Sequence, residues 1–274
     1  MQTVSVSKCG GKRMTGVLMQ SSAGLPLVSV ITAVFNGQPY IAECLESVLK
    51  QDYPNIEHVV LDGGSTDGTL DVLRQYDDRI VFWKSEPDKG VYDAWNKALS
   101  EARGEWICFL GADDEFLPGA ISAYMALAVR HPEAEYLNSR ERWVHSDGYE
   151  RTRGRRWTWP GILRQMCMAH VGSMHRRSLF DRLGIYDSSF GTAADYELLL
   201  RARGSLKTAY MPNITVTMRA GGMTESRASL ADATRAKIVT GGRNTMLAKM
   251  EYCIANAKFM LRPLHRAAGR IAKL

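Results

Sequence analysis

Short apolar runs alternate with segments of helical spacing along the first half of the chain. The apolar runs, each of strand length, span 27–35, 56–61, 80–84 and 106–110. Between and after them, apolar residues recur every three or four positions at 39–49, 70–76, 91–102 and 118–130. Regular alternation of strand and helix requires right-handed crossovers between parallel strands. We therefore predict an α/β fold with a doubly wound, mostly parallel sheet and helices on both faces.

The run at 106–110 is followed by two adjacent acids, Asp113 and Asp114. A run with almost no polar residue is typical of a strand buried on both faces. Ligands of open α/β sheets bind beyond the carboxyl ends of the strands, where carboxylates can hold a hard cation and the anion that it carries. The alternative is that these acids only begin the next helix, whose first turn favours negative charge.

Two neighbouring strand ends carry acids as well. Asp62 ends the second apolar run and opens a glycine-rich loop, and Asp88 lies in the turn after the third run. Because the carboxyl ends of parallel strands meet at one edge, we expect Asp62, Asp88, Asp113 and Asp114 to line one crevice. Helix capping explains one such acid more easily than acids at three strand ends, so the pattern favours a ligand site.

The alternation changes character after residue 134. Extended segments flank a Ser-Asp-Gly turn at 146–148, and the second of them is rich in arginine. Short helices are expected at 178–183 and 195–200, and two late strands at 207–211 and 214–218. The chain is thus expected to consist of a flexible extension at 1–25, two halves of the fold at 26–134 and 135–222, the second smaller and mixed, and a helical basic tail at 223–274.

Basic residues outnumber acids by 35 to 29, which gives a formal net charge of +6. Such a balance suits nucleic acid, anionic lipid or a negatively charged substrate. No RNA-binding signature or zinc-finger spacing accompanies it, so we expect no nucleic-acid partner. The five cysteines are odd in number and far apart, which is typical of reduced cytoplasmic thiols and unlike a cysteine metal site.

No apolar stretch reaches the roughly 20 residues needed to cross a bilayer. In the tail, however, apolar residues between Met246 and Leu261 recur at helical spacing with basic residues beside them. A basic amphipathic helix of this kind can lie on an anionic membrane or pack on its own domain. We expect a cytoplasmic protein and keep open a peripheral contact with the membrane through this tail.

Four ordered motifs resemble the family 2 glycosyltransferases of GT-A fold, over about residues 26 to 220. They are the first strand through Asn36, the run from Val59 to Thr69, Gly90 with its Ala-rich helix, and Phe109-Leu-Gly-Ala-Asp-Asp114. The run from Asp88 to Asn96 is most similar to the exopolysaccharide and colanic-acid-type branch. The resemblance implies a metal-dependent, inverting hexosyltransferase that uses Mn²⁺ or Mg²⁺. It also implies a nucleotide-diphosphate sugar donor bound by the first half, and a glycan or lipid-linked acceptor of a surface polysaccharide bound by the second.

The resemblance assigns roles to single residues. Thr32 and Ala33 would contact base and ribose through the backbone, Phe35 would pack on them, and Asp62 would pair with the nucleobase, with Asp88 in the supporting run. Asp113 would approach the ribose and the metal, and Asp114 would bind the metal. The chain departs from the family at Gly63 and Gly111, where an acid is common.

The expected general base is Asp195 at the start of a later helix, with Glu197 as the second candidate. An inverting displacement needs one base to take the proton of the acceptor hydroxyl. N-capping is the alternative role of Asp195. His170 is a candidate donor to phosphate, although an interior role is commoner for histidine in an apolar run. Arg219 precedes Gly221 and Gly222, so a mobile loop could bring its guanidinium to the pyrophosphate, and a plain surface loop is the alternative.

Two related functions remain open. A polyprenyl-phosphate sugar synthase would use the lipid phosphate itself as acceptor and would need no strong base. A nucleotide-sugar-binding module without catalysis is the second alternative, and the glycines near Asp62 and Asp113 favour it slightly. A Rossmann dehydrogenase is disfavoured, because no Gly-x-Gly-x-x-Gly follows the first strand.

Overall fold

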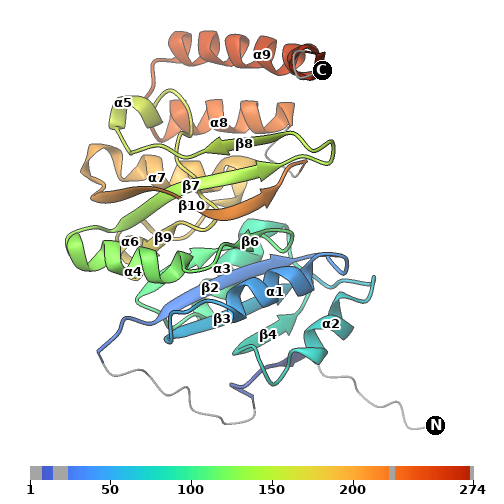
Figure 1. Cartoon of the computed structure of the whole chain (residues 1–274). Helices are drawn as coiled ribbons and strands as arrows, with labels where there is room; N and C mark the ends of the chain where they lie inside the picture. Colours follow the sequence, from blue (N-terminus) through green and yellow to red (C-terminus); the bar gives the residue numbers. More distant parts are fainter. Residues whose placement is uncertain (1–7, 15–23, 222–225, 272–274) are drawn as a thin grey trace. The chain divides into compact units, whose positions relative to one another are not determined.

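The computed structural model describes residues 8–14, 24–221 and 226–271 (Figure 1). Contacts divide the chain into two units. Unit 1 comprises residues 1–157, 167–186 and 206–220, and unit 2 comprises residues 158–166, 187–205 and 221–274. These units rest on packing, whereas the predicted division into donor and acceptor halves is functional and stays a prediction.

All strands of the described residues belong to unit 1 and form one ten-stranded mixed sheet. Its order is β1-β4-β3-β2-β5-β9-β7-β10-β6, and β8 pairs with β7. The strands are β1 (Cys9–Gly10), β2 (Val28–Val34), β3 (Ile56–Asp62), β4 (Phe82–Ser85), β5 (Trp106–Phe109), β6 (Glu115–Phe116), β7 (Tyr136–Val144), β8 (Glu150–Arg153), β9 (Met174–Arg176) and β10 (Thr208–Arg219).

Helices accompany the sheet in unit 1 and make up most of unit 2. Those of unit 1 are α1 (Ile41–Leu49), α2 (Thr69–Gln75), α3 (Val91–Glu101), α4 (Ala120–Arg130) and α6 (Arg177–Leu183). Those of unit 2 are α5 (Trp159–Ile162), α7 (Ala194–Arg201), α8 (Arg227–Val239) and α9 (Thr245–Ile271), with two 3₁₀ turns, Ser188–Ala193 and Arg203–Ser205. None of the helices in the described ranges is long and apolar enough to cross a membrane.

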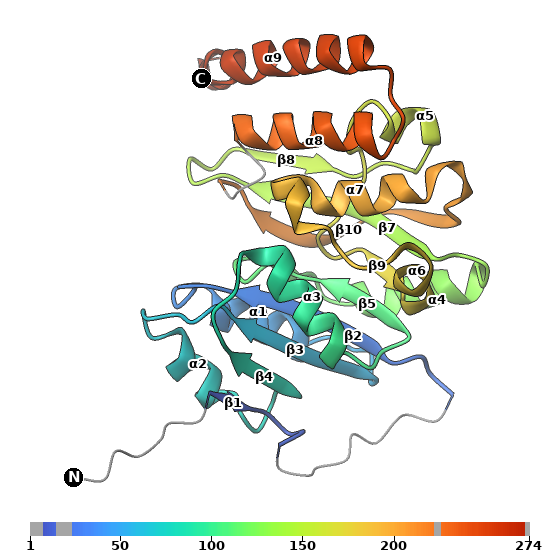
Figure 2. The same cartoon turned by 180° about the vertical axis from the view of Figure 1, so that it is seen from behind.

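Strands β4, β3, β2 and β5 form a continuous parallel block of the sheet and are almost fully buried. Helix α1 covers one face in Figure 1, and α3 covers the other in Figure 2. The apolar stripes of these helices explain the arrangement. Cys44 and Val48 of α1 join the core cluster on one face, and Trp95 and Ala98 of α3 are buried. The predicted doubly wound, mostly parallel α/β sheet is confirmed.

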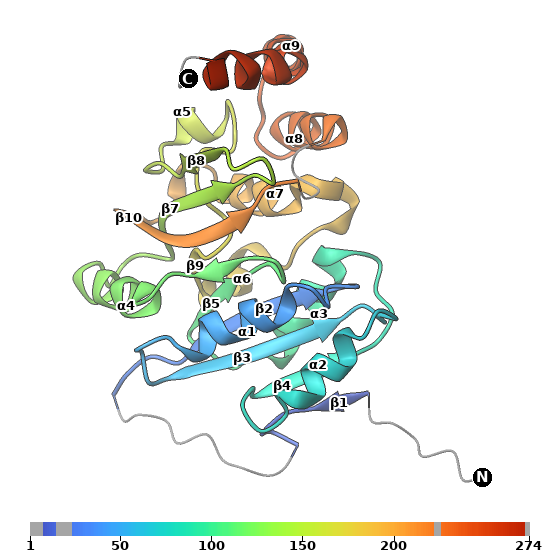
Figure 3. The ribbon, with the colours of Figure 1, turned by 45° about the vertical axis from the view of Figure 1, so that its right-hand side comes forward.

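Part of the expected flexible extension is ordered. Cys9 and Gly10 form β1, which pairs antiparallel with β4 at the edge of the sheet (Figure 3). Arg13 follows them and forms an ion pair of 3.0 Å with the buried carboxylate of Glu57. The prediction of a loose extension is therefore wrong for residues 8–14. The rest of 1–25 lies mostly outside the described residues.

The two predicted late strands are one strand. β10 runs parallel to β7 from Thr208 to Arg219, with register shifts between Tyr210 and Val216. Pro212 lies within this stretch and has no N–H to donate to the neighbouring strand. The pairing with β7 is therefore interrupted there, and the strand continues beyond it. The later part of β10 also pairs antiparallel with β6, and this pairing brings the Arg219 backbone beside Asp114.

Candidate functional site

The loops after β2 and β3 are bonded to each other at the carboxyl edge of the parallel strands. The Asn36 backbone N–H donates to Ser65 Oγ at 2.7 Å, and the Thr66 N–H donates to Asn36 Oδ1 at 2.9 Å. Asn36 adopts φ of +49°, a left-handed conformation that asparagine tolerates better than most residues. These bonds fix the loop that carries Phe35, whose side chain is 65% exposed.

The two residues of β2 that are predicted to contact the donor are less exposed than Phe35. Thr32 is fully buried, and its Oγ1 lies 3.0 Å from Nε2 of His58. Ala33 is half-buried. The Thr32 hydroxyl is thus part of the interior, in keeping with the expectation that any contact of Thr32 with a donor is made by its backbone.

Asp62 is buried, and its carboxylate holds the glycine-rich loop. It accepts hydrogen bonds from the backbone N–H groups of Gly64 and Ser65 at 3.1 and 3.0 Å, and from Ser85 Oγ at 2.6 Å. Ser65 Oγ is a further donor to it. The observed role of Asp62 is therefore to shape this loop, and its pairing with a nucleobase stays a prediction.

Asp88 and Phe35 both approach Gly63. An ideal Cβ built on Gly63 would lie 2.6 Å from Oδ2 of Asp88 and 3.4 Å from the Phe35 ring. An acid at position 63 would therefore collide with the Asp88 carboxylate. The expected convergence of the second and third strand ends is observed, and Asp88 occupies the space that a side chain at position 63 would take.

Asp113 and Asp114 lie together beyond β5. An ideal Cβ on Gly111 would meet the carboxylates of both residues, which means that the two groups converge on the same small space. Asp114 is only 3% exposed, and its Oδ1 accepts a hydrogen bond from the Arg219 backbone N–H at 3.1 Å. Burial, and then the charge of Asp113, raise the pKa of Asp114 well above its usual range.

This pair fits a divalent cation that is bound together with a substrate. Among the described residues, no group of three or more His, Cys, Asp or Glu side chains is arranged to hold a metal ion. Mg²⁺ and similar hard cations are commonly held by only one or two carboxylates, with substrate phosphates and water as the remaining ligands. Two crowded carboxylates, one of them buried, match that donor set. Gly111 leaves the space in which they meet.

Glu141 is a neighbour of this site that the sequence did not single out. Its side chain is 5% exposed, and its charge contributes to the raised pKa of Asp114. Glu141 pairs with Val216 of β10, which in turn pairs with Phe116 of β6. The sequence signals only an acid in an extended, mostly buried run. The proximity of Glu141 to Asp114 arises from pairing between strands that are distant in the sequence, so local spacing does not reveal it.

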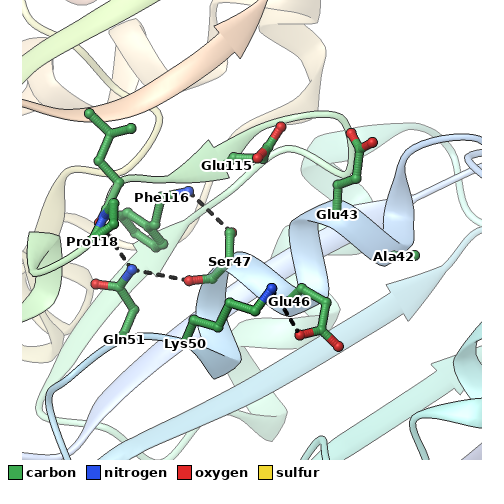
Figure 4. Close-up of a pocket in the computed structure, with 10 residues that line it drawn as sticks. Ala42, Glu43, Glu46, Ser47, Lys50, Gln51, Glu115, Phe116 and Pro118 are labelled. Atoms are coloured by element: carbon green, nitrogen blue, oxygen red, sulfur yellow. Dashed lines mark hydrogen bonds and ion pairs between the residues drawn. The ribbon is translucent and has the colours of Figure 1, made fainter.

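The Arg219 guanidinium is engaged with acids on the surface. It contacts Glu43, lies 3.7 Å from Glu115 and stacks over the Tyr40 ring at 4.8 Å. Glu43 and Glu115 line a groove of about 460 Å³ between α1 and β6, shown in Figure 4. The structure therefore brings the Arg219 backbone to Asp114 and the side chain to this groove, and a contact with pyrophosphate stays a prediction.

His170 has the surroundings of an interior residue. It is 7% exposed, packs against the rings of Trp95, Phe109 and His175, and neither of its ring nitrogens has a hydrogen-bond partner. Burial lowers the pKa of both His170 and His58 to about 3. His170 stacks on Phe109, the last residue of β5, and its predicted contact with phosphate remains a prediction.

The buried histidines predict a loss of stability in acid. Histidine in the unfolded chain titrates near pH 6.5, so the unfolded state gains protons first and the free energy of unfolding falls as the pH drops from about 6.5 towards 3. Between pH 7 and pH 5, the free energy of unfolding of His170→Phe should fall by about 2 kcal/mol less than that of the wild type. Urea unfolding at the two pH values would measure the difference. The exposed Val129→Ala, which changes no titratable group, is the control and should keep the wild-type slope. Equal slopes for wild type and His170→Phe would contradict the buried neutral state.

Asp195 and Glu197 belong to unit 2, at the start of α7. Asp195 is half-buried. Glu197 is 4% exposed and accepts hydrogen bonds from the guanidinium of Arg201 and from Thr240 Oγ1 at 2.8 Å. These bonds engage both oxygens of the Glu197 carboxylate, and Asp195 stays the first candidate for a base.

The chain is similar to known glycosyltransferases over most of its length. Residues 29–181 match the family described as Glycosyl transferase family 2. The uncharacterized glycosyltransferase Rv1514c of Mycobacterium tuberculosis is 37% identical over 186 residues, which cover 65% of this chain and 69% of that protein. The putative teichuronic acid biosynthesis glycosyltransferase TuaG of Bacillus subtilis is 45% identical over 94 residues, which cover 33% and 37% of the two chains.

Solved structures agree in fold. S. aureus TarS 1–349 in complex with UDP-GlcNAc has a TM-score of 0.65 at 21% identity, covering 86% of this chain and 72% of that one. The mannosyltransferase PcManGT from Pyrobaculum calidifontis, in complex with GDP-Man and Mn²⁺, has a TM-score of 0.61 at 21% identity, covering 91% and 76%.

The fold is that of a GT-A glycosyltransferase. The chain belongs to glycosyltransferase family 2. The narrower assignment to the exopolysaccharide and colanic-acid-type branch stays a prediction.

Proposed function

We propose that this enzyme is an inverting, metal-dependent hexosyltransferase. It moves a sugar from a nucleotide-diphosphate sugar to a hydroxyl of a growing, lipid-linked surface polysaccharide. The observation that carries the proposal is the Asp113 and Asp114 pair, placed beyond β5 at the carboxyl edge of the parallel strands. TarS with UDP-GlcNAc, PcManGT with GDP-Man and Mn²⁺, and the role of TuaG in teichuronic acid biosynthesis support the donor, the metal and the product class.

The donor would lie along the edge that the described loops form. Phe35 would offer an exposed aromatic face to the base, and Asp62 and Asp88 would supply carboxylates beside it. Asp113 and Asp114 would hold Mn²⁺ or Mg²⁺, and such an ion neutralises charge on a departing nucleotide diphosphate. The Arg219 N–H keeps the Asp114 carboxylate oriented.

Asp195 would take the proton of the acceptor hydroxyl. A positioned carboxylate contributes roughly 10² to 10⁴ in rate as a general base. A single displacement by an acceptor hydroxyl, assisted by one base, would invert the anomeric carbon. The engagement of Glu197 with Arg201 and Thr240 supports Asp195 for this role.

A lipid-linked acceptor is supported by positive charge in the second half. On one face of the β7 and β8 pair, Trp143 lies opposite Arg151, and the guanidinium groups of Arg151 and Arg153 stack over its ring at 4.7 and 4.4 Å. Arginine held over an aromatic ring suits a phosphate-bearing acceptor such as a lipid diphosphate. The reaction would then take place at the cytoplasmic face of a membrane.

The proposal is tested by release of nucleotide from a panel of donors. Purified enzyme would be incubated with UDP-glucose, UDP-galactose, UDP-GlcNAc and GDP-mannose, with Mn²⁺ or with EDTA, and free nucleotide would be measured. We expect slow hydrolysis of one donor that stops in EDTA, and NMR of the first sugar released should show the inverted anomer. If no donor is hydrolysed or bound in Mn²⁺, the chain is not an active transferase of this kind.

A further inference from the structure

Helix α9 has one packed face and one exposed apolar face. Ala248 is fully buried, and Tyr252 and Ala255, which follow at helical spacing, are half-buried. The buried side adjoins α8 in unit 2 (Figure 1). The other side is exposed and apolar, with exposed fractions of 73% for Met246, 55% for Met250, 54% for Ile254, 59% for Met260 and 47% for Leu261.

These exposed residues form a continuous row. Met246, Met250 and Ile254 are spaced by four residues, and Leu261 follows seven residues later, so all four lie on one side of an α-helix with 3.6 residues per turn. A monomeric protein seldom leaves such a row of large apolar side chains in water. We call this row the apolar face of α9.

Positive charge borders the apolar face on both sides. At 100° per residue, the exposed Lys249 and Lys258 fall on opposite sides of the row through Met250 and Ile254. Glu251 is the one acid in the sequence of α9, and it is turned inward, where it pairs with Lys237 at 3.1 Å and with Arg243 at 2.5 Å. The outward side of the described helix thus combines apolar contact with cationic edges.

We infer that α9 binds in the plane of an anionic lipid surface, with its apolar face in the acyl boundary and its lysines at the headgroups. Lysines on both borders of an apolar row can extend their amines to anionic headgroups while their stems remain in the apolar layer. A second copy of the chain is a poorer occupant, because two such faces would bring four lysines together. The inference concerns unit 2 alone and does not rest on the proposed sugar donor.

The test is co-sedimentation of the full chain with vesicles. Neutral phosphatidylcholine vesicles would be compared with vesicles containing about one third phosphatidylglycerol, at low salt and at high salt. We expect the wild type to bind the anionic vesicles at least tenfold more strongly than the neutral ones. High salt should weaken this preference, because salt screens the attraction between basic residues and anionic headgroups.

Two sets of substitutions separate the two contributions. Met250→Asp with Ile254→Asp should reduce binding to anionic vesicles at least tenfold, because it places charge in the apolar layer. Lys249→Gln with Lys258→Gln should remove most of the preference for anionic vesicles. Val129→Asp on α4 is the matched control, since Val129 is 79% exposed and belongs to unit 1, and it should bind like the wild type.

Circular dichroism and thermal unfolding would confirm that each variant is folded. Equal vesicle binding by the wild type and the folded Met250→Asp, Ile254→Asp variant would overturn the inference. So would a dimer, seen by analytical ultracentrifugation, that this double variant abolishes while vesicle binding is absent. Hydrolysis of the sugar donor in solution should be the same in all these variants, so the failure of this inference is distinguishable from failure of the proposed transferase.

Discussion

Asp114→Asn is expected to lower kcat/KM for sugar transfer by roughly 10³-fold at saturating Mn²⁺, since the stabilisation of departing phosphate charge by a metal ion is worth several kcal/mol. Asparagine has the shape of aspartate and keeps a side-chain oxygen that can accept the hydrogen bond from the Arg219 N–H. What it removes is the negative charge that would bind the cation. Steady-state kinetics over a range of Mn²⁺ concentrations would measure the loss.

The same substitution should not weaken the fold. Asp114 is 3% exposed and lies beside Asp113, so the folded protein without metal keeps a carboxylate in a place that disfavours charge. Removing the charge should leave the melting temperature without metal unchanged or higher. Asp71→Asn on the surface of α2 is the control and should change neither quantity, because the exposed pair of Asp71 with Arg74 contributes little. Activity of Asp114→Asn within threefold of the wild type would show that Asp114 does not bind a required metal.

Asp195→Asn is expected to lower kcat by roughly 10² to 10⁴, the contribution of a positioned general base, while the dissociation constant of the donor stays near the wild-type value. Turnover should change without a change in donor affinity, because Asp195 is assigned to the acceptor and the other acids are assigned to the donor. Single-turnover transfer and calorimetric titration with the nucleotide would measure the two quantities. Turnover retained in the folded variant would remove Asp195 from the base role and favour an acceptor that is already ionised, such as a lipid phosphate.

Glu197→Gln distinguishes the second candidate from the first. Glu197 is buried against Arg201 and Thr240, so its replacement removes the carboxylate that pairs at close range with the largely buried guanidinium of Arg201. Breaking a buried pair costs about 3 to 5 kcal/mol, and partial exposure of Arg201 places the expected loss at or below the lower end. The melting temperature should therefore fall clearly. A catalytic loss as large as that of Asp195→Asn without any loss of stability would make Glu197 the base.

The parallel half of the fold was predictable because each element has its own local pattern. The run from Trp106 to Leu110 is apolar throughout, and the stripe of α3 repeats at helical spacing, so both strand and helix are encoded within short windows. The acids then follow from topology, since parallel strands share one carboxyl edge. The approach of Asp88 to Gly63, just beyond the end of β3, is what that rule predicts.

The features that escaped the sequence depend on pairing between distant segments. The β1 strand is only two residues long and is recognised by its partner β4 rather than by its own composition. Glu141 adjoins the acid pair because β7 meets β10 and β10 meets β6, and no short window contains this information. Spacing also does not specify side-chain geometry. It therefore did not reveal that the Asp62 carboxylate turns towards its own loop, or that Arg201 holds Glu197.

The most direct test of the central claim is the binding of UDP and GDP to the purified chain, measured by calorimetric titration with Mn²⁺ and again after its removal by EDTA. A site formed by the loops after β2, β3 and β4 with the Asp113 and Asp114 pair should bind one of the two nucleotides, and removal of the metal should weaken that binding at least tenfold. Failure of both nucleotides to bind the folded protein in saturating Mn²⁺ would contradict the account.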